Sequence, residues 1–220
     1  MTDAVWMGSN KPDTMADAHL KKRKKLAAAA KAYDWSTAFG ILEKDPDLIN
    51  ATNPGGRSLF TPLHQAAHGG ASVQVVTRLL TLGAWRTIEN ARGERAVDVA
   101  ARCGHMHLIP VLAPECKHDV PLGVLRKIQE HFHAVIRGRA DALVREHELR
   151  LPDLSPLLEL EGGGIWFAVP GMYGGFRYWL DTFGVNAKLL TESWCRVESG
   201  SGQRHAITSQ GYELVDEGFV

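Results

Sequence analysis

The sequence predicts an α+β protein, with an N-terminal stack of helical pairs followed by a small C-terminal antiparallel β-rich domain. Three observations predict this. A helix-forming pattern recurs with a period of 34 residues in the first half of the chain. A further helical segment follows the repeats. From residue 151 onward, short runs of aromatic and β-branched residues alternate with glycine and proline, which is typical of strands joined by tight turns.

The bulk composition is that of an ordinary globular protein of one or two domains. The 25 basic residues balance the 25 acidic ones, which disfavours nucleic acid as a global partner. Three widely spaced cysteines fit a reducing compartment, and we see neither a secretory signal nor an apolar run long enough to span a membrane. We therefore expect a soluble, cytoplasmic protein that has no contact with the membrane.

The repeat begins at Thr61 with Thr-Pro-Leu-His-Gln-Ala-Ala and recurs at Arg95 as Arg-Ala-Val-Asp-Val-Ala-Ala. Threonine caps the free N–H groups of a helix, and proline is tolerated in its first turn. The paired alanines let neighbouring helices approach closely. Gly70 and Gly104, also 34 positions apart, suit a tight reversal with a positive φ. Each copy therefore predicts a helix–turn–helix unit, with Leu79 and Leu80 on the buried stripe of the second helix of the first copy.

These motifs resemble the ankyrin repeat, and the resemblance covers residues 22–112, about two-fifths of the chain. The second copy departs from the pattern, since Arg95 stands in place of the capping threonine and Asp98 in place of the histidine. We expect different hydrogen bonding there. Upstream, the alanine-rich segment 26–32 and residues 35–42 resemble a degenerate first repeat, which gives about three units.

The domain boundaries follow from these patterns. We expect residues 1–20 to be disordered and residues 21–114 to hold the repeats. Residues 115–150 form a helical pair able to cap the stack, and residues 151–220 form the β-rich domain of five or six strands.

Several clusters resemble chemical sites, but each has a simpler structural explanation. His64 and His68 have the i, i+4 spacing of metal ligands, yet His64 belongs to the repeat motif. Cys103, His105 and His107 point in different directions at a helix start, without a fourth ligand. We therefore predict no metal site, no cofactor and no catalytic residues.

Two further segments are unusual. The basic run Lys21–Lys25 could hold an anionic surface, but we interpret it as the solvated opening of the first helix. The glycine-rich segment 169–176 has an exposed aromatic residue and suits ligand contact, although a Pro-Gly turn with a bulge also explains it.

The leading hypothesis is a non-catalytic module that binds another protein, in the way that the ankyrin resemblance implies. Loop tips and exposed positions of the inner helices would make the contacts, and arginine and tryptophan are frequent hot-spot residues. The expected contact residues are Arg57, Phe60, Gln65, Trp85, Arg86, Glu89 and Arg92. The alternative explanation is that these side chains pack within the chain itself, above all Trp85. An accessory protein without chemistry of its own fits the same observations.

The alternative hypothesis places a small-molecule or catalytic site on the β-rich domain. If the chain turns at residues 199–202, Arg196 and Val197 lie opposite Arg204 and His205, and Cys195 could lie close enough to His205 to act as a nucleophile. A one-residue slip in register would reverse the faces, so a buried, inert cysteine is the other interpretation. The expected lining is Tyr173, Trp194, Cys195, Arg204 and His205.

Overall fold

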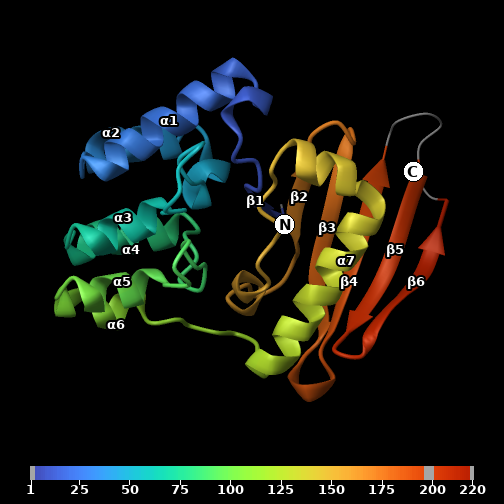
Figure 1. The fold of residues 1–220 in the computed structure, drawn as a ribbon. Helices are drawn as coiled ribbons and strands as arrows, with labels where there is room; N and C mark the ends of the chain where they lie inside the picture. Colours follow the sequence, from blue (N-terminus) through green and yellow to red (C-terminus); the bar gives the residue numbers. More distant parts are fainter. Residues whose placement is uncertain (1–2, 196–200, 219–220) are drawn as a thin grey trace. The chain divides into compact units, whose positions relative to one another are not determined.

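The computed structural model describes residues 3–195 and 201–218, and the chain divides into two compact units. The helical unit is Asn10–Glu115. The sheet unit combines Met1–Ser9 with Cys116–Val220. The helical unit is therefore inserted between the first strand of the sheet unit and the rest of it (Figure 1).

The helical unit consists of three pairs of helices. They are α1 (Asp17–Lys31) with α2 (Trp35–Leu42), α3 (Pro62–His68) with α4 (Val73–Thr81), and α5 (Ala96–Arg102) with the single turn α6 (Ile109–Leu112). Short 3-10 turns lie at Pro12–Thr14, Pro46–Asn50 and Met106–Leu108. The first helix of each pair contacts the first helix of the next, so α1, α3 and α5 form one layer of the unit (Figure 1).

The start of α3 shows why the repeat motif has its residues. The Thr61 hydroxyl accepts a hydrogen bond from the His64 backbone N–H, so it caps the helix as predicted. The Nδ1 atom of His64 lies 2.9 Å from that hydroxyl, and its Nε2 atom lies 3.1 Å from the Glu94 carbonyl oxygen, just before α5. The turns after α3 and α5 have φ values of +62° at Gly70 and +79° at Gly104, which confirms the predicted left-handed positions.

The second copy of the motif forms its helix differently, as expected from its two departures. The Asp98 carboxylate accepts a hydrogen bond of 2.9 Å from the Arg95 backbone N–H and also pairs with the Arg95 guanidinium. Asp98 thus caps α5 locally, whereas the His64 imidazole reaches from α3 to the segment before the next helix.

The sheet unit holds six strands in the order β1-β2-β3-β4-β5-β6. Strand β1 pairs parallel to β2, and every other neighbouring pair is antiparallel. Helix α7 (Leu122–Glu146) lies across one face of the sheet, and 3-10 turns lie at Ser155–Leu158 and Gly184–Asn186 (Figure 1). The strands are Ala4–Trp6, Ile165–Val169, Gly174–Thr182, Lys188–Cys195, Ser201–Thr208 and Gly211–Glu217.

One face of α7 packs into the core of this unit. Leu125, Ile128 and Phe132 recur at helical spacing and are buried, as their sequence pattern predicts. The Phe132 ring lies 4.8 Å from the ring of Tyr178 on β3. The expected pair of helices is present as two helical segments within α7, which meet at a kink where the backbone of Ala140 is non-helical. This helix packs on the sheet of its own unit.

Strand β1 comes from the segment that we expected to be disordered. Trp6 is 3% exposed, and its indole N–H donates a 3.0 Å hydrogen bond to the Arg150 carbonyl oxygen. The Asp3 carboxylate pairs with the Arg177 guanidinium at 2.7 and 3.1 Å and accepts from the Gly164 N–H. Hydrogen bonding to Arg177, more than any other cause, holds the pKa of Asp3 below its usual value.

The predicted fold class, an ankyrin-repeat stack joined to a small antiparallel domain, was wrong, although α+β overall is compatible with the structure. The described residues form seven α-helices and a mixed six-stranded sheet. The sheet is mixed because β1 enters it parallel to β2 from the other end of the chain. A three-residue strand has no readable period of its own, so sequence patterning cannot reveal it.

Candidate interaction groove

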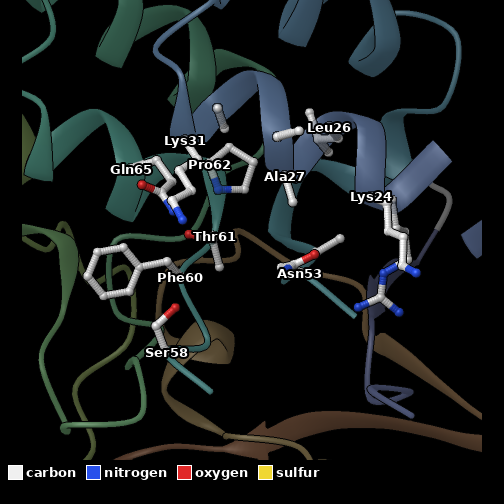
Figure 2. Close-up of a pocket in the computed structure, with 14 residues that line it drawn as sticks. Lys24, Leu26, Ala27, Lys31, Asn53, Ser58, Phe60, Thr61, Pro62 and Gln65 are labelled. Atoms are coloured by element: carbon white, nitrogen blue, oxygen red, sulfur yellow. The ribbon is translucent and has the colours of Figure 1, made fainter. Parts of the chain in front are cut away.

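Two adjoining pockets lie in the helical unit, and both are built from its inner helices and the loops that precede them. The first has a volume of about 300 Å³ and lies between α1 and the segment that leads into α3. Figure 2 shows Lys24, Ala27 and Lys31 of α1 on one side, with Asn53, Phe60 and Gln65 among the residues facing them. The second pocket has a volume of about 460 Å³ and is lined by Arg57, Ser58, Phe60, His68, Ala91, Arg92 and Arg102. Since Ser58 and Phe60 line both pockets, we treat the two as one groove.

Phe60 is the aromatic residue at the junction of the two pockets. Its half-buried ring stacks on the His64 ring at 5.4 Å and meets the His68 ring edge-on at 6.0 Å. The preceding residue, Leu59, has a left-handed φ of +53°, a strained value for a side chain of this size. The turn at Leu59 and the cap at Thr61 therefore set the backbone on both sides of Phe60, and the two histidine rings pack against its side chain.

Two arginines of the groove already have internal partners. Arg23 is 1% exposed and donates a 2.9 Å hydrogen bond to the Thr52 carbonyl oxygen, and burial lowers its pKa to about 10. Arg102 pairs with Glu94 at 2.6 Å. Hydrogen bonds from Arg102, and then from Asn90, hold the pKa of Glu94 at about 2. The prediction that the basic run Lys21–Lys25 is wholly solvated was therefore wrong for one of its five residues, because Arg23 belongs to the core.

Four of the seven predicted contact residues line the groove: Arg57, Phe60, Gln65 and Arg92. Trp85 requires correction, because it is 5% exposed and packs inside the unit, where its backbone N–H donates to the Asn50 side chain at 3.0 Å. Arg86 is partly buried and donates to the Val111 carbonyl oxygen at 3.1 Å. Glu89 is exposed but is not among the lining residues.

Besides the buried Arg23, sequence reasoning missed three cations of the groove: Lys24, Lys31 and Arg102. The signal for the first two was present, because positions seven apart on a helix share a face. Arg102 had no such signal, since its place at the groove depends on how α5 packs beside α3.

Histidines of the two candidate clusters have hydrogen-bond partners within the helical unit. The Nε2 atoms of His105 and His107 lie 3.1 Å from the His68 carbonyl oxygen and 3.2 Å from that of Ala71, so these rings tie the third helical pair to the second. In the described parts of the chain, no group of three or more His, Cys, Asp or Glu residues is arranged to hold a metal ion.

The predicted lining of the β-rich domain is divided between the two faces of the sheet. Tyr173 and Trp194 share a pocket of about 290 Å³ with Trp166, Ala168 and Gly174. Arg204 points to the same face as Trp194 and pairs with Glu192 at 2.6 Å. Cys195 and His205 alternate with these residues and point to the face that α7 covers.

The predicted approach of Cys195 to His205 was wrong. Cys195 pairs with Ser201, and His205 pairs with Thr191, four positions away along β4. Burial lowers the pKa of His205, and the nearby Arg139 lowers it further. Arg196 and Val197, which we expected opposite Arg204 and His205, lie outside the described residues. The two residues of the proposed nucleophilic pair are therefore too far apart along the strands to act together.

The glycines of the segment 169–176 are explained by strand contacts. A Cβ atom on Gly174 would lie 1.9 Å from the Trp194 carbonyl oxygen, and one on Gly175 would lie 2.1 Å from that of Phe167. Glycine is therefore required where β3 passes its neighbours. Tyr173 differs from them, because it is 76% exposed and has a left-handed φ of +49°.

No protein-family model matches the chain. It is similar to the NAD-capped RNA hydrolase NUDT12 of Macaca fascicularis, with 29% identity over 153 residues, which is 62% of this chain and 32% of that protein. It is also similar to the probable E3 ubiquitin-protein ligase XBOS33 of Oryza sativa subsp. japonica, with 34% identity over 140 residues, 63% of this chain and 25% of that protein. The chain thus spans a third or less of these relatives. No helix of the described residues is long and apolar enough to cross a membrane.

Proposed function

We propose that the protein is a non-catalytic, cytoplasmic interaction module and that the groove of its helical unit binds another protein. The observation that carries this proposal is the groove itself, where an aromatic ring lies beside exposed arginines. Phenylalanine in a pocket and arginine at its border are typical of contact surfaces.

The two relatives also support an interaction module. Each match covers more than three-fifths of this chain, so the two matched segments overlap. The names of these two relatives state unrelated activities, those of a hydrolase and a probable ligase. A segment shared by proteins of unrelated activity fits a role in recognition better than a role in catalysis.

A capture experiment with the full chain as bait tests the proposal. We expect a stoichiometric protein partner, and we expect the double variant Arg57→Ala/Phe60→Ala to weaken its binding by about tenfold or more, the loss typical of hot-spot residues. The matched control is Lys25→Ala, at an exposed position of α1 outside the groove. If no protein is retained, or if the control loses the partner equally, the groove is not the contact surface.

A second candidate function is specifically favoured by Tyr173. A strained, exposed tyrosine beside two tryptophans, Trp166 and Trp194, whose rings lie 5.8 Å apart, is an unusual arrangement for a surface turn. We propose as the alternative that this pocket binds a small apolar ligand. Cys195 and His205 have no part in it, because they point to the opposite face of the sheet.

The variant Tyr173→Gly distinguishes the cost of backbone strain at this position from the contribution of its side chain to ligand binding. We expect the sheet unit to become more stable by about 1 kcal/mol, because glycine adopts a left-handed φ without a steric cost. The same change removes one wall of the pocket, so apolar fragments should no longer shift the indole N–H resonances of Trp166 and Trp194. Tyr173→Ala is the control, since it removes the ring but keeps the strain. Unchanged fragment binding in both variants would contradict the ligand site.

A further inference from the structure

The groove is strongly basic, although the chain as a whole carries no net charge. The lining residues of its two pockets include no aspartate or glutamate among the described residues. They include six residues with basic side chains: Arg23, Lys24, Lys31, Arg57, Arg92 and Arg102. A concave surface lined by one sign of charge attracts the opposite charge.

Most of this charge is available to a partner. Arg23 is buried against the Thr52 carbonyl oxygen, and Arg102 is paired with Glu94. The other four cations, Lys24, Lys31, Arg57 and Arg92, have exposed side chains. Within the parts of the chain that the structure describes, Lys24, Lys31 and Arg57 form no ion pair with a carboxylate.

We propose that the occupant of this groove is an acidic segment of a partner protein, with an apolar or aromatic residue among its carboxylates. This inference rests on the proposed function and adds the chemistry of the partner. Phe60 and the small side chains of Ala27 and Ala28 give the partner's apolar residue a surface to pack on. Arginine and lysine at the border of the groove then bind its carboxylates.

The spacing of the cations indicates an extended segment. Lys24 and Lys31 are seven residues apart on α1, which corresponds to about 10 Å along the helix axis. A segment in the extended polyproline II conformation rises about 3.1 Å per residue and returns to the same face every third residue, so it covers about that distance in three residues. Carboxylates about three positions apart would therefore meet both lysines. Arg57 and Arg92 lie at the second pocket, so a longer acidic segment would reach them beyond Phe60.

Fluorescence anisotropy with the full chain tests this chemistry directly. The probe is a labelled peptide of about twelve residues, long enough to span both pockets when extended, with glutamates at every third position and one phenylalanine. We expect the matched glutamine peptide to bind about tenfold or more weakly. We also expect the affinity for the acidic peptide to fall with rising salt. If both peptides bind equally, the inference is overturned.

Charge reversal then locates the binding site. Lys24→Glu and Lys31→Glu should each lower the affinity for the acidic peptide about fivefold or more. The double variant Arg57→Glu/Arg92→Glu should lower this affinity further. Lys25→Glu makes the same change at the neighbouring position of α1 outside the groove and should alter the affinity less than about twofold. Circular dichroism melts establish that each variant is folded. An equal loss of affinity in Lys25→Glu would show a general electrostatic attraction to the surface instead of a binding site, and would overturn the inference.

The captured partner distinguishes this inference from the proposed function. One outcome is a partner whose binding needs Arg57 and Phe60 but does not change with salt or with Lys24→Glu and Lys31→Glu. The proposed interaction module then stands, and the inference of an acidic segment is wrong. If no protein is retained, the proposed function itself fails. Tighter binding of a single-stranded oligothymidylate than of the acidic peptide would overturn the inference in favour of nucleic acid.

Discussion

Replacing Trp6 by alanine is expected to destabilise the sheet unit by about 3–5 kcal/mol, the usual cost of removing a buried tryptophan. Trp6 is 3% exposed, and its indole N–H donates to the Arg150 carbonyl oxygen, which would lose that partner. The Arg150 guanidinium also lies over the Trp6 ring at 4.8 Å. The effect is large because this one substitution removes both the buried ring and its two contacts with Arg150.

Amide hydrogen exchange is the measurement, because a chain of two units need not unfold in one step. Protection should fall across β2 and β3 but stay unchanged in α3 and α4. Trp6→Phe is the control, since it keeps an aromatic ring and loses only the indole hydrogen bond, so a smaller loss is expected. Equal protection of β2 in wild type and Trp6→Ala would refute the structural role of β1.

His64→Ala is expected to destabilise the helical unit by about 2–4 kcal/mol. The imidazole is fully buried and joins the Thr61 hydroxyl to the Glu94 carbonyl oxygen. Alanine would leave a cavity and two polar groups without this partner, one at the start of α3 and one before α5. Hydrogen exchange of α3 and α5 reports the loss for each helix.

His68→Ala is the matched control for this prediction. It removes the same side chain four residues later on the same helix, where the ring is exposed and contacts the Tyr33 hydroxyl at the surface. We expect a change of less than about 0.5 kcal/mol. If the two substitutions cost the same, the link through His64 does not stabilise the unit.

The parts of the fold that the sequence predicted well are those specified by neighbouring residues. Thr61 caps α3, and Gly70 turns the chain in a left-handed conformation, because both requirements are local. The parallel placement of β1 could not be predicted, since Ala4 pairs with Ile165 from the far end of the chain. The predicted register of β4 and β5 was wrong for a related reason. The length of the turn between them was unknown, so the sequence allowed Cys195 to lie opposite any of several residues.

The candidate groove was predictable only in part. Arg57 and Arg92 could be placed because they lie in polar segments between helices, which run over the surface. Trp85 could not be placed from the sequence, since a tryptophan after a helix is equally suited to a contact surface and to a core. Its burial depends on the Asn50 side chain, which lies 35 residues earlier and binds both the Trp85 N–H and the Gly83 carbonyl oxygen.

The position of β1 also sets the order in which the protein can be completed during synthesis. Ala4 is synthesised 161 residues before its partner Ile165. At typical rates of translation the delay is about 10–30 s. During that time Trp6 has no sheet to enter, while all of Asn10–Glu115 has already been synthesised. The nascent chain therefore holds Trp6 without its packing partners, and a chaperone that shields this residue would act before the sheet can close.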